Sequence, residues 1–408
     1  MKQFSIPFRY RSNLISSIKK SRKEADKLKK DFTPTLLDLG PLKIYLARHF
    51  GFCYGVENAI EIAFQTVENN PDKRIFLLSE MIHNPFVNED LLSRGVKFLM
   101  DTKGNELISI NELTSEDIVI IPAFGTTLEI EEKLKAKGIQ LEQYNTTCPF
   151  VEKVWNRAEQ IAKKGYSIVV HGKPTHEETR ATFSHSNANT PTLVINDMKE
   201  AEILGEFILG SRPSQDFYTF FEGRYSQGFI LEKDLEKFGV VNQTTMLATD
   251  TQAIADYLKT IVVKRYNLND NNIDQYFADT RDTLCYATND NQSAVRELLK
   301  TQADLALVIG GRKSSNSSHL VELCEEMLPT YFIQSEEDIT SKEEIKGFHW
   351  RDHTEYIKTN FLPDHTPVRI LITSGASCPD AIVEAVIQKL ISFYPGSKSL
   401  EEIQSEWN

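Results

Sequence analysis

The sequence lacks several features that would assign it to a protein class at once. No apolar run approaches the roughly 18 residues of a membrane-spanning helix. There is no Cys-x-x-Cys pair of the kind that structural zinc sites and ferredoxin-type clusters use. No glycine-rich dinucleotide fingerprint follows a predicted strand. We therefore expect a protein that does not span a membrane and that uses none of these simple cofactor motifs.

An excess of positive charge is also missing. The 408 residues carry 58 acidic and 46 basic side chains, a net charge of -12. A general nucleic-acid binder needs a basic surface to displace counterions, so we expect no nucleic-acid partner. The hydrophobic fraction of 40% and the charged fraction of 25% are typical of a globular protein with two or three domains.

Cysteine is scarce, odd in number and widely spaced. In so large a chain, five cysteines indicate a reducing compartment and not a disulfide framework. Cys53, Cys148 and Cys285 each precede an aromatic residue or a proline and each open a helix-like run. A helix N-terminus favours the thiolate that binds metal, so the three could share one iron–sulfur cluster with one iron left open. Burial as small hydrophobic side chains is the alternative, which suits Cys324 well; Cys378 lies in a polar loop.

The N-terminus is locally basic, with ten Lys and Arg among the first 30 residues against Glu24 and Asp26. A transit peptide is one interpretation, since such segments are basic and poor in acid. A short surface helix that ends before Asp31 is the other, and we favour it because Lys dominates over Ser and Arg. We expect a cytoplasmic protein if the source is bacterial, and a plastid protein if this segment is cleaved.

From residue 43 onward, short β-rich runs alternate with runs of helical period. This alternation predicts an α/β fold with mainly parallel sheets covered on both faces. The expected strands are 43–47, 74–79, 117–124, 167–172, 192–195, 305–311 and 368–375, and the expected helices are 57–69, 129–138, 154–165, 251–266, 319–327 and 381–393.

One of the three cysteines opens or lies within each of three successive α/β stretches. We predict three pseudo-equivalent domains around a central cluster, between a basic extension and an acidic tail. The boundaries are 1–42, 43–147, 148–284, 285–395 and 396–408. An aromatic-rich insertion at 205–238 is expected on the surface of the second domain. We expect its aromatic residues to form local core, and we favour this over a ligand-binding role.

Two glycine-containing loops follow predicted strands and precede helices. One contains Ser314, Ser315 and Asn316 after two glycines, and the other contains Ser377. Backbone and hydroxyl donors at a helix start suit a phosphate, although serine at such a position is often a simple N-cap. Two such loops make anion binding the favoured interpretation.

The segment HGKPTHEET places an imidazole and a carboxyl side by side after a strand. His176 and Glu178 in such a loop suit proton delivery to a bound substrate, better than they suit a metal site. His83, before an Asn-Pro pair, and Thr244, in NQTTML, would by themselves be ordinary turn or strand residues.

In order along the chain, the motifs are GFCYGVENA, IHNPFVN, TTCPFVEKVW, HGKPTHEET, NQTTML, LCYATNDNQ, GGRKSSNSSHL and TSGASCPD. Together they closely resemble the LytB/IspH family, the 4-hydroxy-3-methylbut-2-enyl diphosphate reductases of non-mevalonate isoprenoid biosynthesis. The similarity runs from about Tyr45 to Phe393 and is greatest to the longer subtype of plants and cyanobacteria.

The resemblance implies a [4Fe–4S] cluster bound by Cys53, Cys148 and Cys285, with Glu178 as the proton source. It also implies that His83, His176 and Thr244 face the substrate and that Ser314, Ser315, Asn316 and Ser377 hold its diphosphate. The reaction would be reductive dehydroxylation to isopentenyl and dimethylallyl diphosphate, with a ferredoxin or flavodoxin as electron donor. Many family members have a histidine where this chain has Phe124, so that diphosphate contact is not carried over.

Two other classes of function remain open from the residues alone. One is a non-redox module that binds a phosphosugar through the GGRKSSNSS loop, with the cysteines merely buried. The other is a zinc hydrolase with Cys and His ligands. Iron, sulfide and zinc contents distinguish these two classes from the reductase.

Overall fold

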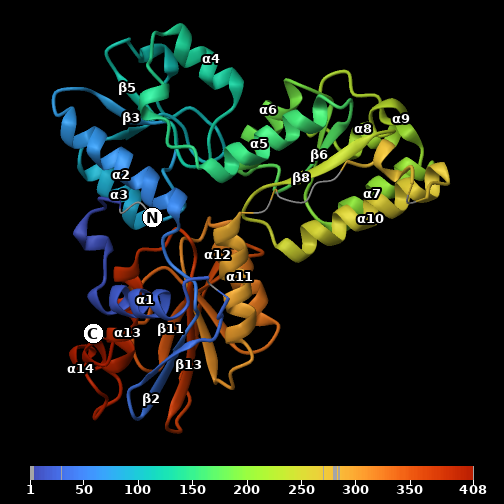
Figure 1. Ribbon diagram of the computed structural model, residues 1–408. Helices are drawn as coiled ribbons and strands as arrows, with labels where there is room; N and C mark the ends of the chain where they lie inside the picture. The colour runs from blue at the N-terminus through green and yellow to red at the C-terminus, as the bar shows by residue number, and fades with distance from the viewer. Residues whose placement is uncertain (1–3, 29, 270, 279–282, 284, 408) are drawn as a thin grey trace. The chain divides into compact units, whose positions relative to one another are not determined.

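The computed structural model describes residues 4–28, 30–269, 271–278, 283 and 285–407. Contacts divide the chain into two compact units, and the division falls inside α2 (Tyr54–Asn69) and α3 (Pro85–Ser93). The first unit comprises Met1–Glu61, Ile82–Glu89 and Tyr286–Asn408, and the second comprises Ile62–Met81 and Asp90–Cys285. Both combine helices with mainly parallel sheets (Figure 1), which confirms the predicted α/β class.

The first unit is built on a five-stranded sheet of order β1-β2-β13-β9-β10. Only β1 is antiparallel to its neighbour, and the other pairings are parallel. A separate antiparallel hairpin, β11-β12, has an exposed second strand. The strands are β1 (Thr35–Asp38), β2 (Leu42–Leu46), β9 (Leu305–Ile309), β10 (Thr330–Ile333), β11 (Glu344–His349), β12 (Thr354–Thr359) and β13 (Val368–Ser374).

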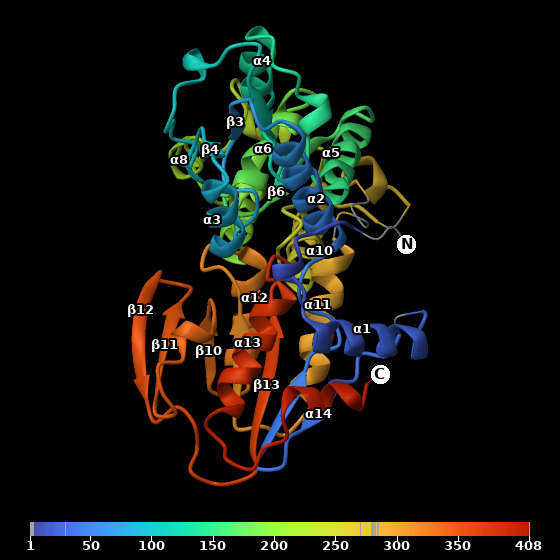
Figure 2. The same cartoon turned by 90° about the vertical axis from the view of Figure 1, so that its left-hand side faces the viewer.

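Helices of the first unit begin with the basic N-terminal segment. They are α1 (Asn13–Ala25), α11 (Tyr286–Leu298), α12 (Ser315–Glu325), α13 (Asp380–Ile391) and α14 (Leu400–Ser405), with short 3-10 turns at Phe8–Tyr10 and Glu336–Asp338. The Ser12 side chain caps α1 by accepting from the Ile15 amide at 2.9 Å. One side of α1 is buried, and the helix lies against α13 and α14 (Figure 2). The predicted N-terminal helix is therefore confirmed.

The second unit contains two three-stranded parallel sheets, of order β4-β3-β5 and β7-β6-β8. Their strands are β3 (Ile75–Leu77), β4 (Lys97–Phe98), β5 (Ile118–Ile120), β6 (Ser167–His171), β7 (Thr192–Ile195) and β8 (Phe238–Asn242). All seven predicted strands are present, as β2, β3, β5, β6, β7, β9 and β13. The strand β2 joins the sheet of the C-terminal stretch, and the three-domain boundaries stay a prediction.

The helices of the second unit are α4 (Leu128–Ala136), α5 (Pro149–Ala162), α6 (Glu177–Asn187), α7 (Met198–Leu209), α8 (Ser214–Phe220), α9 (Leu231–Asp234) and α10 (Ala248–Tyr266), with 3-10 turns at Ile110–Glu112, Glu142–Tyr144 and Ile273–Gln275. All six predicted helices are found, as α2, α4, α5, α10, α12 and α13. No helix in the described part of the chain is long and apolar enough to cross a bilayer.

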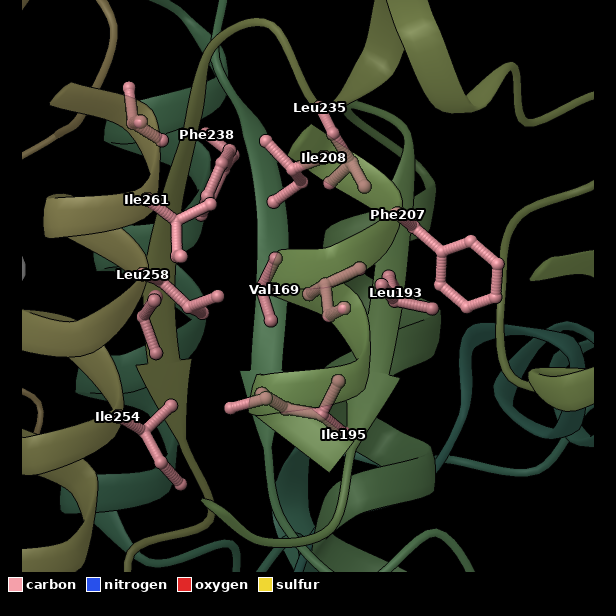
Figure 3. Packing of buried hydrophobic residues seen from close by; sticks show 14 of the residues in the cluster. Val169, Leu193, Ile195, Phe207, Ile208, Leu235, Phe238, Ile254, Leu258 and Ile261 are labelled. Atoms are coloured by element: carbon pink, nitrogen blue, oxygen red, sulfur yellow. The ribbon is translucent and has the colours of Figure 1, made fainter. Parts of the chain in front are cut away.

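The main apolar core of the second unit lies between the β7-β6-β8 sheet and the helices α7 and α10. Val169, Leu193 and Ile254 are completely buried there, between the strands and helices seen in Figure 3. The predicted insertion extends this core, because Phe217 and Phe221 are also fully buried and their ring centroids lie 5.1 Å apart. Its aromatic residues therefore form local core, as the sequence predicted.

The insertion core gives a direct test of packing. Phe217 has no exposed surface, so Phe217→Ala should lower the free energy of unfolding by about 3–5 kcal/mol through the cavity it leaves. Phe220, three residues along the same helix, keeps 37% of its surface exposed, and Phe220→Ala should cost much less. Urea unfolding followed by circular dichroism measures both. Equal losses in the two variants would contradict this core.

A second test concerns His185, whose ring stacks on Trp155 at a centroid distance of 3.7 Å. Burial lowers the pKa of His185 below its usual value. The unfolded chain then binds the proton more readily, so this contribution to stability is present above about pH 6.5 and lost as the pH falls below it. Thermal unfolding at pH 7.5 and 5.5 should therefore show wild type losing more stability than His185→Phe. An identical loss in both proteins would contradict the prediction.

Candidate functional site

The predicted residues of the first unit follow three neighbouring parallel strands. Cys53 comes after β2, Ser377 after β13, and Ser314 after β9. These strands are adjacent in the order β2-β13-β9, and parallel strands end at the same edge of a sheet. The fold therefore brings together residues that are more than 300 positions apart in the sequence.

Backbone hydrogen bonds join these loops to one another. The Ala376 carbonyl accepts from the Cys53 amide at 3.2 Å, and the Ala376 amide donates to the Asn316 Oδ1 at 2.8 Å. A single residue of the loop after β13 thus links a predicted cluster ligand to a predicted diphosphate ligand. This arrangement fixes the start of α2 against the start of α12.

The serine-rich loop begins α12. The Ser314 hydroxyl accepts from the Ser317 amide at 3.2 Å, so it caps the helix, which was one of the two predicted roles. Ser314, Ser315, Asn316 and Ser377 are all buried. A side chain at Gly310 or at Gly375 would collide with the Ser317 hydroxyl, which explains the glycines. Buried polar donors around a helix N-terminus form an environment that suits an anion.

His83 belongs to the same unit and lies at the same loops. The Ser377 hydroxyl donates to the His83 carbonyl oxygen at 3.5 Å. That carbonyl sits so close to Gly311 that any side chain there would overlap it. Five of the predicted substrate residues are therefore gathered at one edge of one sheet.

In the second unit, the predicted proton donor Glu178 is buried in the first turn of α6. It was predicted to lie in a loop, but His176 caps the helix, its Nδ1 accepting from the Glu178 amide at 3.2 Å. The Thr244 amide donates to the Glu178 carboxylate at 2.5 Å. The three predicted residues are thus in direct contact, and this bond orients the carboxyl group at the carboxyl end of β6.

Cys148 is the N-cap residue of α5. Its amide donates to the Ala123 carbonyl at 2.9 Å. The next residue, Phe124, packs edge-on against His176 with ring centroids 5.4 Å apart. The phenyl ring therefore supports the imidazole by packing.

Thr283, two residues before Cys285, contacts the end of β8. The Thr283 hydroxyl donates to the Asn242 Oδ1 at 2.6 Å, at the end of β8 and two residues before Thr244. Sequence reasoning missed the neighbouring Gln243, whose Oε1 accepts from the Thr179 hydroxyl at 3.0 Å and whose Nε2 donates to the Thr245 hydroxyl. An amide side chain directly after an apolar strand was the signal for it.

The five cysteines fall into two kinds of environment. Burial raises the pKa of Cys324 and of Cys378 to about 12, so both remain protonated thiols. Cys53, Cys148 and Cys285 each stand immediately before the first residue of a helix, as predicted, where the helix dipole favours a thiolate. These donors suit an iron–sulfur cluster.

The three thiols come from both units. Cys53 belongs to the first unit, and Cys148 and Cys285 to the second. Among the described residues, no three His, Cys, Asp or Glu side chains are grouped to hold a metal ion. The convergence of the three thiols stays a prediction.

Comparison with known proteins places these motifs in one family. Residues 44–391 match the model of the LytB protein family. A 4-hydroxy-3-methylbut-2-enyl diphosphate reductase of Cyanothece is 36% identical over 96% of this chain and 92% of its own length. The reductase of that name from Crocosphaera subtropica is 38% identical over 86% of this chain and 85% of its own.

A solved structure shares the fold. The E-1-hydroxy-2-methyl-but-2-enyl-4-diphosphate reductase from Plasmodium falciparum superposes with a TM-score of 0.61. The match covers 86% of this chain and 89% of the other, at 21% sequence identity. From the extent of the family match and from these relatives, the chain belongs to the LytB family.

Proposed function

We propose that this protein reductively removes the hydroxyl group of 4-hydroxy-3-methylbut-2-enyl diphosphate, giving isopentenyl and dimethylallyl diphosphate. The reductase names of relatives over nearly the whole chain support this reaction. The observation that carries the site assignment is the contact of Glu178 with His176 and Thr244, because it puts a buried acid beside the polar groups expected to face a substrate.

The diphosphate would be held in the first unit. Ser314, Ser315 and Asn316 start α12, whose N-terminal amides carry partial positive charge toward an anion. Ser377 adds a hydroxyl from the neighbouring loop, and its contact with the His83 carbonyl fixes that loop. These groups would anchor the end of the substrate that does not react.

The cofactor of this proposal is one [4Fe–4S] cluster, held by Cys53, Cys148 and Cys285. When bound, such a cluster supplies electrons and a Lewis-acidic iron for the departing hydroxyl. The residues of the chain supply the rest. The three cysteines stand at helix starts that favour thiolates, whereas burial raises the pKa of Cys324 and Cys378 to about 12.

Glu178 would act as the proton donor. Hydroxide is a poor leaving group, so a proton must reach its oxygen as the carbon–oxygen bond breaks, and water then leaves. The Thr244 amide holds the carboxyl in one orientation, and His176 shares the same helix start. The full turnover consumes two electrons and two protons, the second proton ending on carbon.

The acid assignment predicts a large effect on turnover alone. Glu178→Gln keeps the shape of the side chain but cannot deliver the proton, so turnover should fall about 10²–10⁴-fold. The visible absorbance of the cluster should be unchanged. Glu132→Gln, at an exposed position of α4, is the control and should keep full activity. Wild-type turnover in Glu178→Gln would overturn this role.

The ligand assignment predicts that substitution of three of the five cysteines lowers the iron content and that substitution of the other two does not. Anaerobically purified wild-type protein should hold about four irons per chain. Cys53→Ala, Cys148→Ala and Cys285→Ala should each lose cluster iron, whereas Cys324→Ala and Cys378→Ala should keep it. Iron and sulfide analysis measures this, together with a reductase assay using dithionite. One zinc per chain would indicate the hydrolase instead, and no metal the phosphosugar module.

A further inference from the structure

The basic N-terminal segment, residues 4–30, differs in charge from the rest of the chain. The first 30 residues hold ten Lys and Arg against two acids, while the remaining 378 hold 36 Lys and Arg against 56 Asp and Glu. Arg9, Arg11, Lys20 and Lys23 are exposed. The segment lies outside the range matched by the family model, and none of its residues has a part in the proposed chemistry.

This segment packs beside the loop that carries Cys53. A hollow of about 640 Å³ is lined by Tyr10, Arg11 and Lys19 on one side and by Phe52, next to Cys53, on the other. Ring centroids of Tyr10 and Phe52 lie 6.0 Å apart. Arg11 and Lys19 therefore line a hollow that includes the residue before a predicted cluster ligand, together with Glu57 and Asp380.

The hollow also carries two acidic side chains. Asp380 pairs with Lys19, with 2.7 Å between its Oδ1 and the Nζ. Glu57 is partly buried and lines the hollow beside Arg11. The exposed Lys20 and Lys23 are not among the residues that line it.

Exposed aromatic rings complete the surface. Phe8 is 77% exposed, Tyr54 45% and Phe86 38%. The Arg9 guanidinium lies 5.3 Å from the Phe86 ring centroid, and Tyr10 packs edge-on against the same ring. Ser16 of α1 lines the same hollow, and Lys20 and Lys23 lie four and seven residues after it, on the same stripe of the helix. We call the exposed set the basic aromatic face; its members are Phe8, Arg9, Arg11, Lys20, Lys23, Tyr54 and Phe86.

We infer that the basic aromatic face is the docking surface for a small acidic electron-carrier protein, an inference that rests on the proposed function. Arginine and aromatic residues dominate the binding energy of protein interfaces. Complementary charge speeds and orients the encounter of two proteins. Tyr54 directly follows Cys53, so a carrier docked here would lie over a cluster ligand.

The electron balance fits a carrier that delivers one electron at a time. Each substrate accepts two electrons and two protons, its carbon–oxygen bond breaks, and one water leaves. The carrier is oxidised in two successive encounters, so it must dissociate and return. A salt-sensitive, electrostatically steered surface suits such a transient complex better than a large apolar interface does.

The test compares two double charge reversals of equal size. Arg9→Glu/Lys20→Glu changes the face, and Lys346→Glu/Lys358→Glu changes exposed lysines on the β11-β12 hairpin of the same unit. With an acidic plant-type ferredoxin as probe, the first variant should raise the Kd by calorimetry and the KM by about tenfold or more. The hairpin variant should match wild type in both.

Two readouts separate docking from a structural role. Turnover with dithionite, which needs no docking surface, should stay within about twofold of wild type in both variants, as should the thermal midpoint within a degree or two. Added salt should weaken ferredoxin binding to wild type and have less effect on the face variant.

Several outcomes would overturn the inference. The face variant could bind ferredoxin with the wild-type Kd, or the hairpin variant could lose as much ferredoxin affinity as the face variant. Dithionite-driven turnover of the face variant could fall as far as its ferredoxin-driven turnover. The face could also mediate self-association of this protein in place of carrier binding. If wild type lacks dithionite activity, the proposed function itself fails. If wild type has that activity and ferredoxin binding ignores the face, only the docking surface is refuted.

Discussion

Parallel pairing of β2, β13 and β9 is the constraint on which the first unit depends. It makes three distant segments end at one edge, and the loops after them carry Cys53, Ser377 and Ser314. Because Ala376 bonds to both flanking loops, a shift in the register of β13 would displace all three at once. Gly310, Gly311 and Gly375 have no side chain, so the loops can approach closely enough to bury their polar groups.

In the second unit, too, predicted site residues lie near the ends of parallel strands. Glu178 lies in the first turn of α6 after β6, Thr244 follows β8, and the Cys148 amide donates to Ala123 in the loop after β5. The Thr244 amide donates in turn to the Glu178 carboxylate. Backbone amides are well suited to this purpose, because their position is fixed by the sheet and not by a flexible side chain. Phe124 adds an apolar contact to this group, since its ring packs edge-on against His176.

The N-terminal helix extends this framework beyond the family match. Leu14, Ile15 and Ile18 bury one side of α1, and the Ser12 hydroxyl donates to Glu384 of α13. The helix is therefore part of the core of the first unit, while its charged side stays exposed. A chain that is acidic elsewhere thus presents one basic region beside a predicted cluster ligand.

Elements with strong periodicity could be predicted from the sequence, and weaker ones could not. The strand β4 has two residues and β12 is largely exposed, so neither carries an apolar signal, and β8 follows directly on the aromatic insertion. Gln243 was missed because its signal, an amide after an apolar strand, depends on β8, which was not predicted. Its role follows from Thr179, which lies 64 residues away in sequence and contacts it only after folding.

By itself, the sequence determined the α/β class, the cysteines at helix starts and the polar loops at strand ends, because these follow from local period and residue chemistry. Only the tertiary structure decided that Glu178 lies in a helix against Thr244, that the His83 carbonyl rests on Gly311, and that burial raises the pKa of two cysteines to about 12. Such contacts join segments far apart along the chain, and burial exists only once those segments have packed together.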